Sequence, residues 1–151
     1  MKRLFIYYSH TGCGDLVATD FSKSRFDIRK VIEKKKMPKS FFMQMMVGGF
    51  RAGISAKGKL VDYDPDVKDY EEIVIGSPIW NGKIPPAING VLANTDLSNK
   101  KLTFVFYSGS GEGKGALKKV NKLYKDADAL FLKQPNKYPE ELKKLASLLG
   151  K

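Results

Sequence analysis

The stretch Glu72–Gly82, EIVIGSPIWNG, restricts the fold more than any other part of the chain. Its Ile73–Ile75 run is short, apolar and β-branched, which is typical of a strand buried on both faces in the middle of a parallel sheet. Gly76-Ser77-Pro78 ends that strand, so Trp80, the only tryptophan, falls on a loop just past the strand's carboxyl end. Ligands of open α/β sheets bind in the crevice at those ends. The Trp80 ring is therefore expected either to fill the core or to face a flat ligand.

Strand, turn and helix patterns alternate along the rest of the chain. Strands are predicted at Leu4–Tyr8, Arg25–Ile32 (an edge strand with one wet face), Ile73–Ile75, Leu102–Tyr107 and Ala129–Leu132. Two helices are predicted after the first and third strands, at Asp15–Ser22 and from Pro85-Pro86 through Val91. A third follows the apolar stripe of Leu117, Val120, Tyr124 and Ala127, and a fourth begins at Pro139, with Leu142, Leu145 and Leu149 facing inward. This alternation predicts an α/β fold, a doubly wound five-stranded parallel sheet with right-handed crossovers and helices on both faces. No repeat, linker or low-complexity tract divides the chain, so residues 1–151 are expected to form a single domain.

The segment Met37–Leu60 has two interpretations. Phe41, Phe42, Met45 and Met46 lie close to helical spacing, which favours a helix that covers one face of the sheet, although Gly48-Gly49 weakens it. The alternative is an adaptable contact surface of Met and Phe side chains beside the ligand.

Composition and charge limit the classes of protein. Hydrophobic residues make up 42% of the 151 residues, which indicates a globular chain. The single cysteine, Cys13, allows no internal disulfide, and no stretch approaches the ~20 apolar residues that span a bilayer, so a cytoplasmic protein without a membrane span is expected.

The net charge of +11 is concentrated in two segments. Seven basic and two acidic residues lie between Arg25 and Lys39 (+5), and ten basic and four acidic residues lie between Lys114 and Lys151 (+6). Such a surface favours acidic partners, anionic lipid or nucleic acid. No nucleic-acid motif accompanies the lysines, so a solvated lysine face is preferred to a nucleic-acid site.

Three loops rich in small residues follow the first, third and fourth predicted strands: Ser9–Gly14, Ser77–Gly82 and Ser108–Gly113. In a doubly wound sheet they can meet at one edge, around a switch point. The first loop has hydroxyl groups and leads into a helix, so its N–H groups can converge on a phosphate, although an ordinary turn explains the loop equally well. Ser108–Gly115 fails the Walker A pattern and fits a dinucleotide fingerprint weakly. One histidine and one cysteine make no metal site, and no Ser-His-Asp set can be assembled.

Taken together, these loops resemble those of the flavodoxin family over nearly the whole chain. YYSHTGCG is similar to the phosphate loop of that family, IVIGSPIWNGKIPP to its strand-three signature, and SGSGEG to its third flavin loop. The resemblance implies a flavodoxin-like FMN-binding domain with strand order 2-1-3-4-5. It also implies three sets of binding residues: Ser9, His10, Thr11, Gly12, Cys13 and Gly14 for the FMN phosphate; Pro78, Ile79, Trp80, Asn81 and Gly82 for the isoalloxazine; and Gly109, Ser110, Gly111, Glu112 and Gly113 for the pyrimidine edge.

The chain departs from the family pattern in three ways. Gly14 replaces the usual hydroxyl residue, SGSGEG lacks the tyrosine that many flavodoxins place against the outer flavin face, and the chain is basic where flavodoxins are typically acidic. The resemblance implies an FMN electron carrier that serves redox protein partners and has no catalytic residues of its own, and the net charge of +11 predicts that these partners have acidic docking surfaces. Two alternatives are an FMN-dependent NAD(P)H quinone, nitro or flavin reductase of the same fold, and a binding module that has lost its cofactor.

Overall fold

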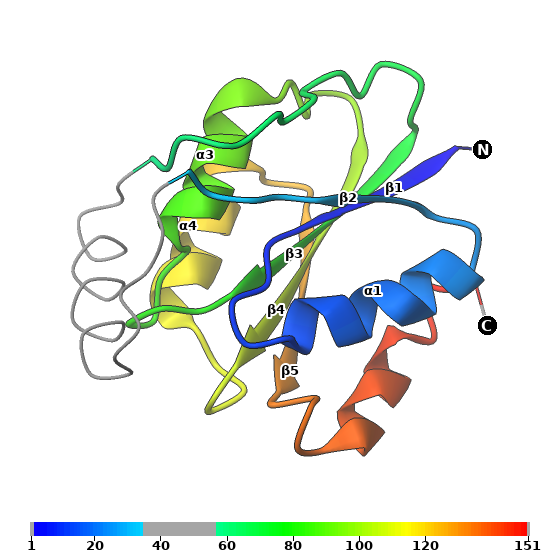
Figure 1. Cartoon of the computed structure of the whole chain (residues 1–151), viewed down its shortest axis with the longest axis vertical. Coiled ribbons are helices and arrows are strands. Elements are labelled where there is room, and N and C mark those ends of the chain that lie inside the picture. The colour runs from blue at the N-terminus through cyan, green and yellow to red at the C-terminus, as the bar shows by residue number, and fades with distance from the viewer. Residues whose placement is uncertain (1, 35–56, 151) are drawn as a thin grey trace.

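The structure is a computed structural model, and it describes residues 2–34 and 57–150. Its centre is a sheet of five parallel strands in the order β2-β1-β3-β4-β5, as Figure 1 shows. The strands are β1 (Arg3–Tyr7), β2 (Asp27–Lys30), β3 (Glu72–Pro78), β4 (Lys101–Ser108) and β5 (Asp128–Lys133). The predicted α/β fold, with its parallel sheet and its strand order 2-1-3-4-5, is therefore confirmed.

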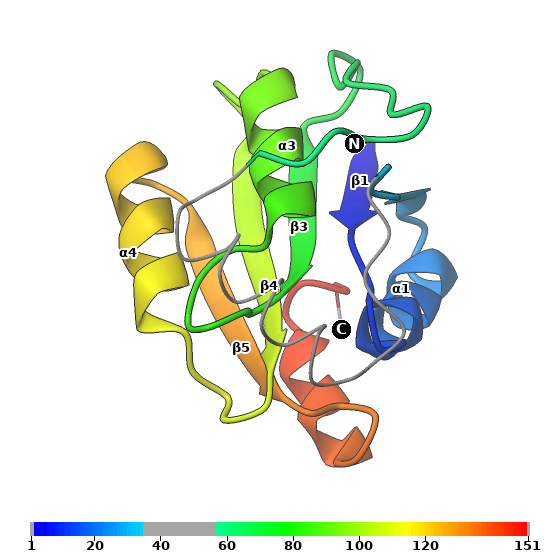
Figure 2. The ribbon, with the colours of Figure 1, turned by 60° about the vertical axis from the view of Figure 1, so that its left-hand side comes forward.

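Helices cover both faces of this sheet, as predicted. Figure 2 shows α3 (Pro86–Asn94) and α4 (Lys114–Leu123) on one face, with α1 (Cys13–Lys23) and the short 3-10 helix η1 (Pro139–Leu145) on the other. Each face has its own apolar core: alternate strand residues such as Ile6, Ile75 and Phe104 pack toward α3 and α4, whereas Phe5, Val74 and Val105 pack toward α1 and η1. The Ile73–Ile75 run is fully buried, because a central parallel strand is covered on both sides.

Three expected helical features differ from the structure. The last helix is a 3-10 helix, with i→i+3 bonds such as that from Ala146 N to Lys143 O (3.2 Å). The helix α4 ends at Leu123, so Tyr124 and Ala127 lie beyond it, although both still pack against the core. Leu117 is 37% exposed, because the buried line of α4 runs through Ala116 and Val120 and the next residue points about 100° away from it.

The helix predicted at Met37–Leu60 falls mostly outside the described residues. Its last four residues, 57–60, are described and are not helical. Lys34 N donates to Lys59 O (2.8 Å), and Leu60 forms an antiparallel bridge with Glu33. Residues 57–60 therefore pair with the chain just past β2.

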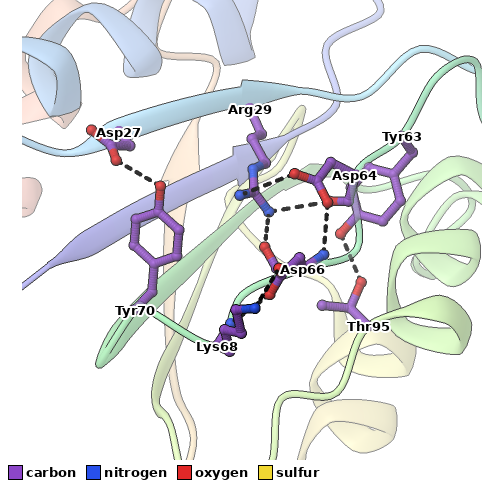
Figure 3. Close-up of polar contacts among 8 residues, drawn as sticks. All are labelled: Asp27, Arg29, Tyr63, Asp64, Asp66, Lys68, Tyr70 and Thr95. Atoms are coloured by element: carbon purple, nitrogen blue, oxygen red, sulfur yellow. Dashed lines mark hydrogen bonds and ion pairs between the residues drawn. The ribbon is translucent and has the colours of Figure 1, made fainter.

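The segment between this pairing and β3 is fastened to the edge strand β2 (Figure 3). Arg29 Nη1 donates to Asp64 O (3.1 Å) and Asp66 O (2.6 Å), and Arg29 Nη2 lies 3.6 Å from the Asp64 carboxylate. Tyr70 Oη donates to the Asp27 carboxylate (2.6 Å), which raises the pKa of the phenol. These contacts tie the segment to β2, the edge strand of the sheet.

In the described part of the chain, no helix is long and apolar enough to cross a membrane.

Candidate functional site

The three loops singled out in the sequence lie together. They follow β1, β3 and β4, which are neighbours in the sheet and run parallel, so their carboxyl ends share one edge. The first and second loops meet where the His10 ring packs edge-on to Trp80, with ring centroids 5.7 Å apart. The second and third loops meet at Gly113, where an added Cβ would lie 3.0 Å from Ile79 Cδ1. The structure thus brings all three predicted sets of binding residues to one place.

The first loop exposes backbone N–H groups at the start of α1. Gly12 adopts a left-handed φ of 94° at the N-cap, and Ser9 Oγ accepts the N–H groups of Gly12 (3.2 Å) and Gly14 (3.1 Å). The N–H groups of Thr11 and Cys13 have no acceptor among the described residues. Free N–H groups at a helix start, reinforced by the helix dipole, form an arrangement that binds anions.

The position of Gly14 is set by the two tyrosines beneath the loop. A Cβ at Gly14 would lie 2.5 Å from Tyr107 Oη, 2.8 Å from Tyr7 Cδ2 and 2.8 Å from Ser9 Cβ. Tyr107 Oη is held there because it donates a hydrogen bond to Tyr8 O. The hydroxyl residue that the family pattern has at this position is therefore excluded by packing.

A chain of polar contacts leads away from the loop toward β2. Tyr7 Oη donates to Asp15 Oδ1 (2.7 Å), and Lys30 Nζ lies 2.8 Å from the same oxygen. Burial and the Asp15 carboxylate raise the pKa of Tyr7. Burial alone would raise the pKa of Asp15, but the hydrogen bonds from Lys30 and Tyr7 outweigh it and lower that pKa. Asp15 thus stays charged in the first turn of α1, with Lys30 as its counter-ion.

The second loop is a tight hairpin turn. Trp80 N donates to Lys83 O (2.9 Å) and Lys83 N to Trp80 O (3.0 Å), and the residues between them, Asn81 (φ 52°) and Gly82 (φ 74°), are both left-handed. Two positive φ values define a type I′ turn, in which Asn-Gly is the preferred pair. The turn is fixed to the next helix, because Ala116 N donates to Gly82 O (2.9 Å).

The sequence left open whether the Trp80 ring fills the core or faces a flat ligand, and in the structure the ring is only partly buried. It is half-buried and packs against the core, with the Tyr8 ring in an edge contact at 5.9 Å. The aromatic rings of Tyr8, His10 and Trp80 thus form one cluster where the first two loops meet.

The third loop contains a buried hydroxyl group without a partner. Ser108 is 8% exposed at the carboxyl end of β4, and its Oγ has no hydrogen-bond partner in the described structure. The loop is braced by the chain after β5, since Gln134 N donates to Ser108 O (3.0 Å) and Gln134 Nε2 to Gly109 O (3.0 Å). An unpaired buried hydroxyl is costly, and Thr103 Oγ1 within the same strand is unpaired in the same way.

Sequence reasoning missed the residues that support these loops. Tyr107 supports the start of the first loop through its bond to Tyr8 O, and Tyr7 and Lys30 hold Asp15, which follows the loop. Asn136 accepts a hydrogen bond from Cys13 Sγ (3.2 Å). Their only sequence signal was a place at a strand end or in a loop. Among residues 2–34 and 57–150, no cluster of three or more His, Cys, Asp or Glu side chains forms a metal site.

This strand order, with three loops at the switch point, defines a doubly wound α/β protein. No protein-family model and no curated protein matches the sequence. Solved structures do match. A candidate flavoprotein from Bacteroides eggerthii is 16% identical, with a TM-score of 0.76 over 99% of this chain and 98% of that one. A flavoprotein from Lactobacillus acidophilus, solved in complex with FMN, is 18% identical, with a TM-score of 0.65 over 85% and 89%. Oxidised flavodoxin 1 from Bacillus cereus is 13% identical, with a TM-score of 0.56 over 99% and 95%. The chain therefore has the flavodoxin-like fold.

Proposed function

We propose that the chain binds FMN at the carboxyl edge of its sheet and transfers electrons between redox proteins. The observation that carries this proposal is the first loop, where the N–H groups of Thr11 and Cys13 are free at the start of α1 and Gly12 takes a left-handed conformation. A phosphate is the group that such a loop accommodates. The neighbours support the assignment, because one was solved with FMN and another is an oxidised flavodoxin.

The residues around this edge fit FMN in type. The Trp80 ring is half-buried beside the first loop, which suits contact with a flat ring system. In this proposal the binding residues are those of the three loops: Ser9, His10, Thr11, Gly12, Cys13 and Gly14; Pro78, Ile79, Trp80, Asn81 and Gly82; and Gly109, Ser110, Gly111, Glu112 and Gly113.

Each part of the chain has a distinct task in this proposal. FMN supplies the electron transfer when it is bound. The first loop holds its phosphate by N–H groups and by the Thr11 hydroxyl, and the loop has no lysine or arginine. The Trp80 ring would pack against the bound flavin, and the Asn81–Gly82 turn would set the backbone beside it. A single free cysteine suits work in a reducing compartment such as the cytoplasm.

A reductase is the second candidate function. The third loop, SGSGEG, has no aromatic side chain to cover the outer flavin face, and Gly109, Ser110 and Glu112 are exposed. A quinone or nitro compound can stack on an uncovered face, and NAD(P)H would then supply the electrons. Anaerobic mixing with NADH or NADPH separates the two functions: rapid bleaching of the flavin supports a reductase, whereas unchanged absorbance supports a carrier.

Cofactor binding is tested with Thr11→Ala. The purified protein should be yellow and release FMN, and Thr11→Ala should bind FMN about 10-fold more weakly, since a charge-assisted hydrogen bond contributes roughly 1–3 kcal/mol. Thr19→Ala is the matched control, because Thr19 lies one turn beyond the loop and its Oγ1 bonds to Asp15 O (3.1 Å). Equal FMN affinity for the parent, Thr11→Ala and Thr19→Ala in a fluorescence titration would refute the phosphate site.

A further inference from the structure

The exposed face of α4 carries an uncompensated row of positive charge. Lys114, Lys118 and Lys122 are all exposed, and their spacing of four residues places them along one side of the helix. We call these three residues the α4 lysine row. The helix contains no acidic residue, and no carboxylate within the described structure pairs with any of the three.

Three lysines elsewhere in the described structure do have a carboxylate partner. Lys30 pairs with Asp15 (2.8 Å), Lys68 with Asp66 (3.7 Å) and Lys144 with Glu141 (2.9 Å). Exposed lysines such as Lys101 and Lys125 also have no carboxylate partner in the described structure, so the α4 lysine row is distinguished by its spacing along one helix face next to the third loop.

This arrangement opposes the stability of α4. Lys114 occupies the first turn, where the helix dipole disfavours a cation, and the N-cap residue Gly113 offers no side-chain hydrogen bond. Like charges four residues apart also repel each other along a helix. A sequence that breaks these local rules without a compensating contact is characteristic of a surface kept for function.

The α4 lysine row adjoins the candidate cofactor site. The helix begins directly after the third loop, and its Ala116 N–H binds the carbonyl of Gly82 in the second loop. A Cβ at Gly115 would lie 2.9 Å from Lys83 Cγ, so the stem of Lys83 runs against the first turn of α4. Figure 2 shows α4 at the side of the sheet that it shares with α3.

An exposed apolar side chain lies beside these charges. Leu117, 37% exposed, follows Lys114 by three residues and thus lies next to it on the helix surface. Its exposed surface gives a partner bound to the lysines one apolar group to bury.

We propose that the α4 lysine row and Leu117 form the docking surface for an acidic protein, the redox partner of the FMN site; this inference rests on the proposed function. Charge complementarity identifies the partner as acidic and speeds its approach. A nucleic acid fits less well, because α4 has neither an arginine for bidentate phosphate contacts nor an aromatic residue for stacking. A membrane surface fits less well because an interfacial helix needs a broad apolar face, whereas α4 exposes only Leu117 and Leu123 among its apolar side chains, and six residues of helix place these two on different sides.

The test compares two triple variants that remove the same charge. Lys114→Gln/Lys118→Gln/Lys122→Gln neutralises the α4 lysine row, and Lys23→Gln/Lys101→Gln/Lys125→Gln neutralises three exposed lysines at the opposite edge of the sheet. Those control residues end α1, begin β4 and precede β5, so they lie at the amino ends of the strands.

Two probes report on the surface. Labelled poly-L-glutamate stands in for an acidic protein, and its affinity is measured by fluorescence anisotropy with both the FMN-free and the FMN-loaded chain. Ferricyanide, a small anion, oxidises the reduced FMN-loaded chain in a stopped-flow instrument. The affinity and the oxidation rate are both measured from about 0.01 M to about 1 M salt, a range that shortens the Debye length from roughly 30 Å to roughly 3 Å.

The α4 variant should bind poly-L-glutamate about 10-fold more weakly than the parent at low salt, and its ferricyanide reaction should slow by a similar factor. The control variant should change both by less than about 2-fold, and high salt should remove the differences. Equal effects of the two variants would overturn the inference, because total charge would then explain the result. Tighter binding to a DNA duplex or to phosphatidylglycerol vesicles at about 0.15 M salt, lost in the α4 variant, would overturn it in favour of those ligands.

The proposed function is tested separately in the same samples. If the chain binds no FMN, but the α4 variant alone loses affinity for poly-L-glutamate, the electron carrier is refuted and the docking surface for an acidic protein is retained. A chain that binds FMN while the two variants behave alike retains the carrier and refutes the surface.

Discussion

Gly14→Ala provides the sharpest test of how the first loop is built. The added methyl group would lie 2.5 Å from Tyr107 Oη and 2.8 Å from both Tyr7 Cδ2 and Ser9 Cβ. These three groups cannot all retreat, because Tyr107 Oη is bonded to Tyr8 O and Tyr7 Oη to Asp15. The substitution therefore overpacks the space between α1 and the sheet.

The magnitude follows from two opposing contributions. Overpacking a core costs roughly 1–3 kcal/mol, and three simultaneous contacts below 3.0 Å place this site near the upper limit. Replacing glycine by alanine inside a helix returns up to about 1 kcal/mol. Gly14→Ala should therefore lower the free energy of unfolding by about 2 kcal/mol, or Tm by roughly 4–8 °C for a chain of this size.

Urea denaturation of the FMN-free protein, followed by far-ultraviolet circular dichroism, measures this change. Gly109→Ala is the control, because the nearest atom to its added Cβ is Gln134 Nε2 at 3.6 Å, an ordinary contact. In a Tyr107→Phe background the cost of Gly14→Ala should shrink, since the nearest clashing atom is gone. A Gly14→Ala protein as stable as Gly109→Ala would refute the packing argument.

The remaining predictions concern the edge strand, the counter-ion and the turn. Arg29→Met should lower the free energy of unfolding by about 1–2 kcal/mol through loss of its bonds to Asp64 and Asp66, whereas Lys68→Met, which breaks an exposed pair, should leave the urea midpoint unchanged. The pKa of Asp15 is lowered in the folded chain, so the charged carboxylate contributes to stability above its ordinary pKa of 3.8, and this contribution is lost as the pH falls through the lowered pKa. The difference in unfolding free energy between the parent and Asp15→Asn should therefore disappear over that acidic range. A difference that stays constant with pH would contradict this. Gly82→Ala should cost about 1 kcal/mol because its φ is 74° with open space around it, and Gly82→Asn should cost less; equal urea midpoints for the two variants would show that backbone strain is absent.

Sequence periodicity was sufficient for the sheet. The β-branched run Ile73–Ile75 and the LTFVFY run both became central strands, because only a strand covered on both faces can bury every side chain in such a run. Helix ends were less predictable: Tyr124 and Ala127 continue an apolar stripe, yet α4 stops at Leu123 and the chain turns through the bond from Ala127 N to Tyr124 O (3.2 Å). An apolar stripe reports which side chains are buried and not whether the backbone stays helical.

The loops of the candidate site were also identifiable from the sequence, because glycine and small residues after a buried strand mark the carboxyl edge of a parallel sheet. The residues that hold these loops in place were not identifiable from the sequence. The contact of Gly14 with Tyr107 joins residues that are far apart in the sequence, and nothing in the local pattern around Gly14 indicates that a side chain is excluded there. The unpaired Ser108 hydroxyl likewise depends on how β4 is covered, which is a property of tertiary packing.

The bond from Ala116 N to Gly82 O has a consequence for cooperativity. It makes the turn beside the candidate cofactor site and the first turn of α4 a single mechanical unit, because the carbonyl cannot rotate without freeing an N–H group of the helix. Ligands on either side of such a unit are coupled when they favour different arrangements of it. If a protein bound at α4 changes the affinity for a ligand at the turn, that ligand must change the affinity for the protein by the same factor. In the proposed function, electron exchange would then end with a change in how tightly the two proteins bind each other, so the hydrogen bond that shapes the site would also influence when they separate.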